Sequence, residues 1–168
     1  MVKKIAVISD THCLKWEDIN SDMRMEIQNA DIAIHCGDIV RQSVVDGFLN
    51  SSKERHIVHG NSDPVEIRES LPYTKIINVE GVKIGITHPA WAGPEFPPEE
   101  LFKDFEVKPD IILFGHTHET LNEYIQGTLF VNPGQGYKSF MVDGTMAFIT
   151  IDGNKFHAEI KIIEKGKP

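Results

Sequence analysis

The sequence predicts an α/β protein built from two β-sheets that pack face to face, with helices on the outside. Three observations support this prediction. The first 64 residues alternate short apolar runs with segments of helical spacing, in the order βαβαβ. Residues 73–87 have strand-forming residues on both sides of Glu80-Gly81, which predicts a hairpin. The chain beyond residue 120 alternates strand-forming segments with turns.

The first half of the chain predicts a parallel sheet. Residues 4–9 form a near-continuous apolar run, as expected of a strand buried on both faces of such a sheet. Further strands are predicted at 31–35 and 54–58, and helices at 16–30 and 41–50. The strands end at Asp10, at Gly37-Asp38 and at Gly60-Asn61. Open α/β sheets bind ligands at the carboxyl ends of their strands, so these junctions are candidate site positions.

The second half supplies the remaining strands. The hairpin, with strands at 73–79 and 82–87, leads into His88, and a short helix is predicted at 99–105. A buried strand at 110–114 opens into Gly115-His116-Thr117-His118. Five further strands are predicted at 120–125, 128–131, 139–142, 146–151 and 156–164.

Length and charge limit the class of protein. The 168 residues, 40% hydrophobic and 25% charged, fit a single domain spanning 1–168. The net charge of −8 gives no field that attracts nucleic acid or an anionic membrane, and no segment approaches the roughly 20 apolar residues of a membrane span. We therefore expect no membrane association and no stable nucleic-acid binding. Cys13 and Cys36 are too few for a disulfide framework, which predicts a cytoplasmic location.

Two short motifs stand out against chance. In a shuffled chain of this composition, Asp-x-His and Gly-Asp would be common, so Asp10-x-His12 and Gly37-Asp38 alone carry little information. Gly60-Asn61-x-Asp63 and Gly115-His116-x-His118 would be rare, yet both follow predicted strands. Together they predict a functional site.

The same strand ends gather four histidines and two aspartates. One such histidine would be an ordinary polar residue at a strand edge, but the whole group would be unfavourable without a cation among its members: His12, His88, His116, His118, Asp10 and Asp38. We expect an extended chain at Asp10-x-His12 and at His116-x-His118 to send each pair of side chains to one face. Asp38 can bridge two ions. Mixed nitrogen and oxygen ligands favour Mn²⁺, Fe, Co²⁺, Ni²⁺ or Zn²⁺ over Mg²⁺ or Ca²⁺.

These motifs, in this order, resemble those of the calcineurin-like metallophosphoesterases. His35-Cys36-Gly37-Asp38, Asn132-Pro133-Gly134 and the short chain are most similar to the small YfcE-type prokaryotic phosphodiesterases. The resemblance extends from Ile5 to about Ile151 and implies a four-layer αββα sandwich with two mixed sheets.

The resemblance also implies a centre of two divalent metal ions. One ion would be held by Asp10, His12 and His118, the other by Asn61, His88 and His116, with Asp38 bridging them. Manganese is the first expectation for both, with nickel, iron, cobalt and zinc as alternatives. We expect Asp38, Asn61 and His12 to take part in catalysis as well as in metal binding.

The expected reaction is in-line hydrolysis of a small phosphodiester or nucleotide-type substrate by a hydroxide that bridges the two ions. Alternatives are a phosphomonoesterase or a nucleotide pyrophosphohydrolase on the same site, or a non-catalytic scaffold module of the same fold, as found in a membrane-coat complex. All seven ligand positions carry a competent ligand, which favours an enzyme. A homo-oligomer is expected by analogy with the family.

Two positions differ from the pattern of many relatives. Ser62 stands where larger relatives have a histidine that protonates the leaving group, so we expect good leaving groups to be favoured and Ser62→Ala to have little effect. Pro89 replaces a common glycine, so the substrate loop must differ, and its Trp91 and Phe96 either stack on substrate or pack on protein. Asp63 is expected either to bind nearby backbone or to be a simple turn residue.

Overall fold

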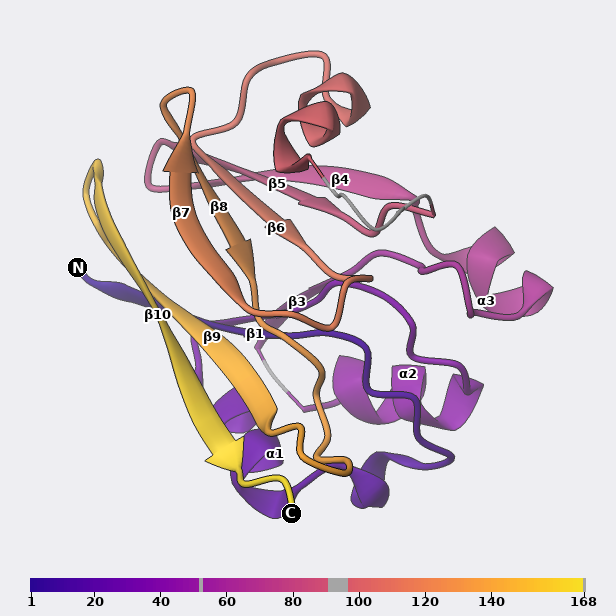
Figure 1. Cartoon of the computed structure of the whole chain (residues 1–168). Coiled ribbons are helices and arrows are strands. Elements are labelled where there is room, and N and C mark those ends of the chain that lie inside the picture. The colour runs from indigo at the N-terminus through magenta and orange to yellow at the C-terminus, as the bar shows by residue number, and fades with distance from the viewer. Residues whose placement is uncertain (52, 91–96, 168) are drawn as a thin grey trace.

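Two five-stranded sheets stack face to face in the computed structural model, which describes residues 1–51, 53–90 and 97–167 (Figure 1). The first sheet has the order β10-β9-β1-β2-β3 and the second has the order β4-β5-β6-β8-β7. Both sheets are mixed. The predicted α/β sandwich is confirmed.

The first sheet has a parallel half and an antiparallel half. β1 pairs with β2 and β2 with β3 in parallel, whereas β9 is antiparallel to β1 and to β10. The strands are β1 (Lys3–Ile8), β2 (Ile32–His35), β3 (Glu54–Ile57), β9 (Gly144–Asp152) and β10 (Lys155–Glu164).

The second sheet is parallel at its centre and antiparallel at its edges. β5 pairs with β6 and β6 with β8 in parallel, while β4 and β7 are antiparallel to their neighbours. The strands are β4 (Thr74–Val79), β5 (Val82–Thr87), β6 (Ile111–Phe114), β7 (Leu121–Ile125) and β8 (Thr128–Asn132).

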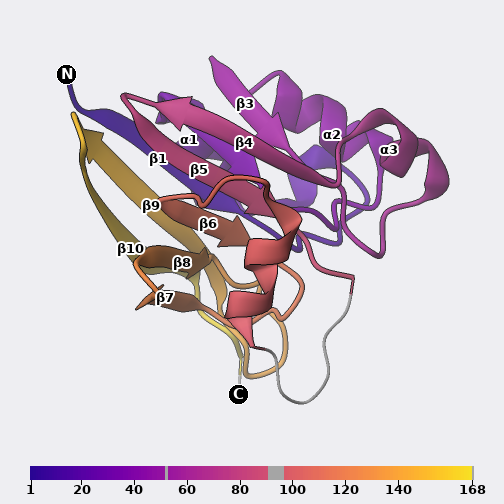
Figure 2. The same cartoon turned by 90° about the horizontal axis from the view of Figure 1, so that it is seen from above.

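Helices cover the outer faces of the two sheets, as Figure 2 shows. The first sheet is covered by η1 (Trp16–Asp18), α1 (Ser21–Asn29), α2 (Gln42–Leu49) and α3 (Val65–Ser70). The 3-10 helix η2 (Pro98–Asp104) packs on the second sheet through Leu101, which meets Phe114 and Phe130. The outer layer on this side is therefore thin.

Apolar packing between the layers fixes the strand ends that carry the site. Val7 and Ile34 of the first sheet pack between the sheets with Ile84 and Leu113 of the second, and all four are fully buried. Burying a side chain of this size contributes about 1.5–3 kcal/mol relative to exposure. This packing holds the two sheets so that the carboxyl ends of β1, β2 and β3 lie beside those of β5 and β6.

Two local predictions differ from the structure, and one helix was not predicted. Residues 139–142 are not a strand, because Ser139 and Val142 pair with each other across a tight turn and Met141 has a φ of 60°. The single helix predicted at 16–30 is η1 followed by α1, since Asn20 caps α1 by accepting the amides of Asp22 and Met23. The short helix α3, which follows Pro64, was not predicted.

In the part of the chain that the structure describes, no helix has the length and apolar character needed to cross a membrane. Cys13 and Cys36 are both free thiols. The cytoplasmic location stays a prediction.

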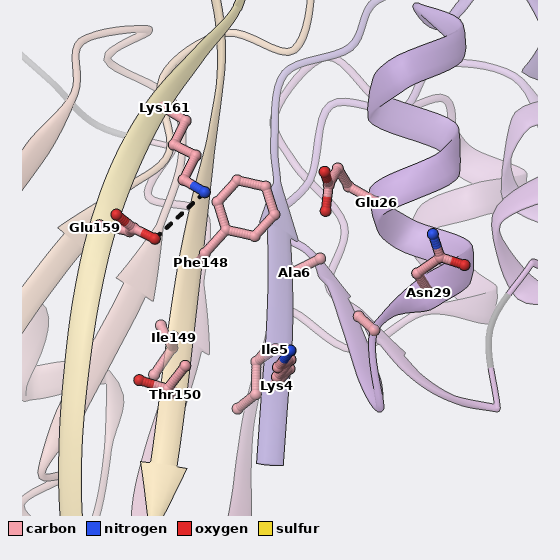
Figure 3. A pocket seen from close by; sticks show the side chains of 11 residues that line it. Lys4, Ile5, Ala6, Glu26, Asn29, Phe148, Ile149, Thr150, Glu159 and Lys161 are labelled. Atoms are coloured by element: carbon pink, nitrogen blue, oxygen red, sulfur yellow. Dashed lines mark ion pairs between the residues drawn. The ribbon is translucent and has the colours of Figure 1, made fainter. Parts of the chain in front are cut away.

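A groove of about 370 Å³ lies on the helix side of the first sheet, away from the predicted site (Figure 3). Phe148 lies in it, with Lys161 Nζ 5.0 Å from the ring centroid and 3.4 Å from Glu159 Oε1. Lys4 and Glu26 complete its charged lining. None of the seven predicted ligands lines this groove.

Candidate metal centre

The seven predicted ligands meet where the carboxyl ends of the parallel strands of the two sheets lie side by side. The first sheet delivers four of them and the second delivers three. They follow β1 (Asp10, His12), β2 (Asp38), β3 (Asn61), β5 (His88) and β6 (His116, His118). Because β1, β2 and β3 run parallel, as do β5 and β6, the loops after them converge at one edge.

The backbone is left-handed at five of these residues. The φ angle is 52° at Asp10, 41° at His12, 60° at Asp38, 85° at His116 and 61° at His118. Such values are uncommon outside glycine and concentrate at functional sites. The prediction of an extended chain at Asp10-x-His12 and at His116-x-His118 is therefore wrong, because β1 and β6 end before these segments begin.

One group of four side chains could hold a cation. Asp10, His12, Asp38 and His118 each offer a ligand atom, and these atoms lie within 4.8 Å of one another. Asp10 Oδ1 is 3.4 Å from His118 Nε2 and 3.9 Å from His12 Nε2. Asp10 Oδ1 and His12 Nε2 are also buried with no hydrogen-bond partner among the described residues. Because an unpaired buried polar atom is unfavourable, this donor set fits a metal ion.

A second group gathers around Asn61. Its Oδ1 lies 2.9 Å from His88 Nε2 and 2.9 Å from His116 Nδ1. In its neutral form His88 donates from Nδ1 to the carbonyl of Cys36, at 2.8 Å, which leaves Nε2 as an acceptor facing the acceptor oxygen of Asn61. A cation between two such acceptors would satisfy both.

Asp38 lies between the two groups. Its Oδ2 is 3.4 Å from His12 Nε2 in the first group and 3.4 Å from His88 Nε2 in the second. Its other oxygen, Oδ1, accepts the amide of Ser62 at 2.8 Å, which fixes the direction of Oδ2. One carboxylate oxygen thus faces both groups.

The aspartates and histidines of the site shift one another's pKa values. Burial alone would raise the pKa of Asp10, but His118 and His12 beside it hold that pKa well below its usual range. The pKa of Asp38 is likewise low, because His12 and His88 outweigh the effect of burial. In return, Asp10 and Asp38 raise the pKa of His12 to about 9. Both carboxylates are therefore charged at neutral pH and available to a cation.

Two carboxylates are anchored by backbone amides. Asp10 Oδ2 accepts from Ser9 Oγ at 2.8 Å and from the amide of His116 at 3.1 Å, which ties the β1 loop to the β6 loop. Asp63 accepts from four amides: Gly60, Asp38, Ile39 and Val40, at 2.7, 3.1, 2.8 and 2.7 Å. The prediction that Asp63 binds nearby backbone is confirmed.

Two glycines of the motifs are required by close approach. A Cβ on Gly60 would overlap Oδ1 of Asp38, and a Cβ on Gly115 would overlap Oγ of Ser9. The glycines therefore allow the loops to pack directly against the carboxylates.

His35 supports the site from behind. The buried His35 accepts the amide of Gly37 at Nδ1, 3.0 Å away, so that Nε2 donates to Thr11 Oγ1 at 3.1 Å. The ring thus joins the loop after β2 to the loop after β1. Burial lowers the pKa of His35 to about 4.

Some residues of interest lie elsewhere or were not predicted. Ser62 is exposed, and Trp91 and Phe96 lie outside the described residues. Sequence reasoning missed Gln135, which contacts His118, because no motif marks it beyond its place after the strand β8. Burial raises the pKa of Cys13 to about 11 and that of Cys36 as well, so both thiols stay protonated at neutral pH.

Comparison with known proteins gives one family. The model described as "Calcineurin-like phosphoesterase superfamily domain" matches residues 4–154. A probable metallophosphoesterase of Methanocaldococcus jannaschii, MJ0623, is 30% identical over 132 residues, which are 77% of this chain and 66% of that protein. Phosphodiesterase MJ0936 of the same organism is 28% identical over 151 residues, covering 79% of this chain and 83% of that protein.

A solved structure has the same fold. Vacuolar protein sorting 29 of Cryptosporidium parvum superimposes with a TM-score of 0.78 at 20% identity, covering 98% of this chain and 99% of that one. At this identity the likeness concerns the fold alone.

Proposed function

The chain belongs to the calcineurin-like phosphoesterase superfamily, and from this membership we propose that it is a phosphodiesterase whose site binds two divalent metal ions. One ion would be held by Asp10, His12 and His118 and the other by Asn61, His88 and His116, and Asp38 would be shared. The observation that carries the proposal is the position of Asp38 Oδ2, 3.4 Å from a histidine nitrogen of each group. A carboxylate oxygen in this position can bridge two adjacent ions.

The residues of the chain prepare the site for an anionic phosphoester. Two bound divalent ions would clamp the phosphoryl oxygens and lower the pKa of a bound water for in-line attack. Asp38 keeps the two groups adjacent through Oδ2, and Asn61 holds His88 and His116 together within the second group. His12, whose pKa is raised by Asp10 and Asp38, must lose its proton before it can bind an ion. Manganese remains our first expectation, and the mixed nitrogen and oxygen donors suit it as well as they suit nickel, iron, cobalt or zinc.

The test is hydrolysis of bis-p-nitrophenyl phosphate and of p-nitrophenyl phosphate by metal-stripped protein, titrated with Mn²⁺, Ni²⁺ and Mg²⁺. We expect metal-dependent hydrolysis of the diester and its loss in Asp38→Ala and in His116→Ala. Glu119→Ala, at an exposed position in the loop after His118, is the matched control and should keep the activity.

The ratio of the two rates separates the proposed diesterase from a monoesterase. A faster reaction with the monoester would overturn the proposed substrate class while leaving the metal centre intact. Binding of two ions without turnover of either ester would favour a scaffold role. The likeness of the fold to vacuolar protein sorting 29 supports that alternative.

A further inference from the structure

Gln135 lies behind one of the histidines of the first group. It follows β8, and only 5% of its surface is exposed. Its Oε1 is 3.3 Å from Nδ1 of His118, the nitrogen that faces away from Asp10. The opposite nitrogen, His118 Nε2, is 3.4 Å from Asp10 Oδ1.

The orientation of the Gln135 amide is fixed by its other end. Nε2 donates to the carbonyl of Tyr137 at 2.8 Å and to Oγ of Ser139 at 3.0 Å. Because both contacts are made by the NH₂ group, Oε1 is the atom that faces His118 and accepts its Nδ1–H. A neutral His118 therefore carries its proton on Nδ1 and has its lone pair on Nε2.

His118 depends on the hydrogen bond to Gln135 more than His88, a histidine of the second group, depends on any single contact to stay in place. The His88 side chain is fully buried and is held by the carbonyl of Cys36, whereas 33% of the His118 side chain is exposed. His118 also sits on a left-handed backbone, with φ of 61°. Among the described residues, Gln135 is the hydrogen-bond partner of His118 Nδ1.

We propose that Gln135 is a positioning residue, which fixes the ring and tautomer of His118 so that Nε2 binds the ion of the first group. This inference rests on the proposed two-metal site. Groups that orient a ligand in this way typically contribute about 10- to 100-fold to metal affinity. The effect is confined to one ion, because Gln135 has no contact with Asn61, His88 or His116 among the described contacts.

The experiment is calorimetric titration of the metal-stripped full chain with Zn²⁺ and with Mn²⁺. Gln135→Met keeps the length of the side chain but offers only a weakly accepting sulfur, and we expect one of the two ions to bind 10- to 100-fold more weakly while the other is unchanged. Gln135→Glu keeps an acceptor oxygen for Nδ1 but loses the two donors at Nε2, so we expect it to bind this ion more tightly than Gln135→Met without fully restoring the affinity. Gln28→Met, on the exposed face of α1, is the matched control.

A spectroscopic readout separates positioning from a loss of folding. In the Zn²⁺-loaded protein, we expect the Nδ1 proton of His118 to give a slowly exchanging NMR signal that Gln135→Met loses and Gln135→Glu retains. Equal affinity of both ions in Gln135→Met, or an unchanged Nδ1 signal, would overturn the inference. If the unmutated chain binds fewer than two ions, the proposed function fails first, and this failure is distinguishable because it needs no variant.

Discussion

The carboxylate of Asp63 holds the main chain of Asp38, whose amide it accepts at 3.1 Å. The same carboxylate accepts the amide of Gly60, so that the loops after β2 and β3 are joined at the point where Asp38 and Asn61 enter the site. Asp63 is buried and faces only backbone donors in these contacts. Its role is to shape the site without entering it.

Asp63→Asn should therefore destabilise the protein. The amide keeps one acceptor oxygen but places an NH₂ group against amides that need an acceptor. Leaving a buried donor unpaired costs about 1–3 kcal/mol, so we expect the free energy of unfolding to fall by about 3 kcal/mol. Urea unfolding of the metal-free protein measures this, with Asp152→Asn at an exposed position of β9 as the control. Equal stability of the two variants would contradict the role given to Asp63.

The burial of His35 leads us to expect that the folded protein loses stability in mild acid. Its pKa is about 4 in the folded protein because of burial, below the value of about 6.5 expected when unfolded. A lowered pKa means that the unfolded chain takes up a proton first, so this contribution is present above pH 6.5 and is lost as the pH falls toward 4. The loss is on the order of 3 kcal/mol.

Urea unfolding of the metal-free protein between pH 7 and pH 4 tests this window. His35→Gln cannot titrate, so its stability should change less with pH than that of the unmutated protein. The proton on His12 acts in a different range, because its raised pKa stabilises the fold below pH 6.5 and loses that effect toward pH 9. Parallel pH curves for His35→Gln and the unmutated protein would refute the assignment.

The sequence predicted where the seven candidate ligands meet but not the backbone conformation that presents them. Parallel strands put Asp10, Asp38 and Asn61 at one edge by topology alone, which apolar runs reveal. Left-handed φ angles at Asp10 and His116 are set by packing between loops, such as the Asp10 contact with the amide of His116, which no local pattern encodes. Gln135 was not predicted for the same reason, because its contact with His118 joins two loops that are distant in the sequence.

Gly115→Ala should damage the site through overlap alone. The φ of Gly115 is not in the left-handed region, so alanine suits its backbone, but a Cβ there would overlap Ser9 Oγ and lie 2.7 Å from Asp10 Oδ2. Ser9 donates to that same oxygen at 2.8 Å, so the overlap must displace Asp10. Overpacking of this kind typically costs about 1–3 kcal/mol, and we expect metal affinity to fall at least tenfold with it.

Calorimetric titration with Mn²⁺ measures the effect of Gly115→Ala, and thermal unfolding of the metal-free protein shows whether the variant folds. Gly153→Asn is the control, because no atom lies within 4 Å of a Cβ at this turn and asparagine tolerates its φ of 61°. Unchanged affinity in Gly115→Ala would show that the loop can move without displacing Asp10.

Ser62→Ala should change the rate of diester hydrolysis by less than about threefold. Ser62 touches Asp38 through its backbone amide, which alanine keeps, and its exposed hydroxyl makes no hydrogen bond among the described residues. Asn61→Ala, one residue earlier, removes the oxygen between His88 and His116 and should abolish metal-dependent turnover. Without a general acid at position 62, which is worth typically 10² to 10⁴-fold, the rate should depend steeply on the leaving group. Kinetics with aryl diesters of graded phenol pKa measure this slope, and a 100-fold loss in Ser62→Ala would reveal a catalytic role for its hydroxyl.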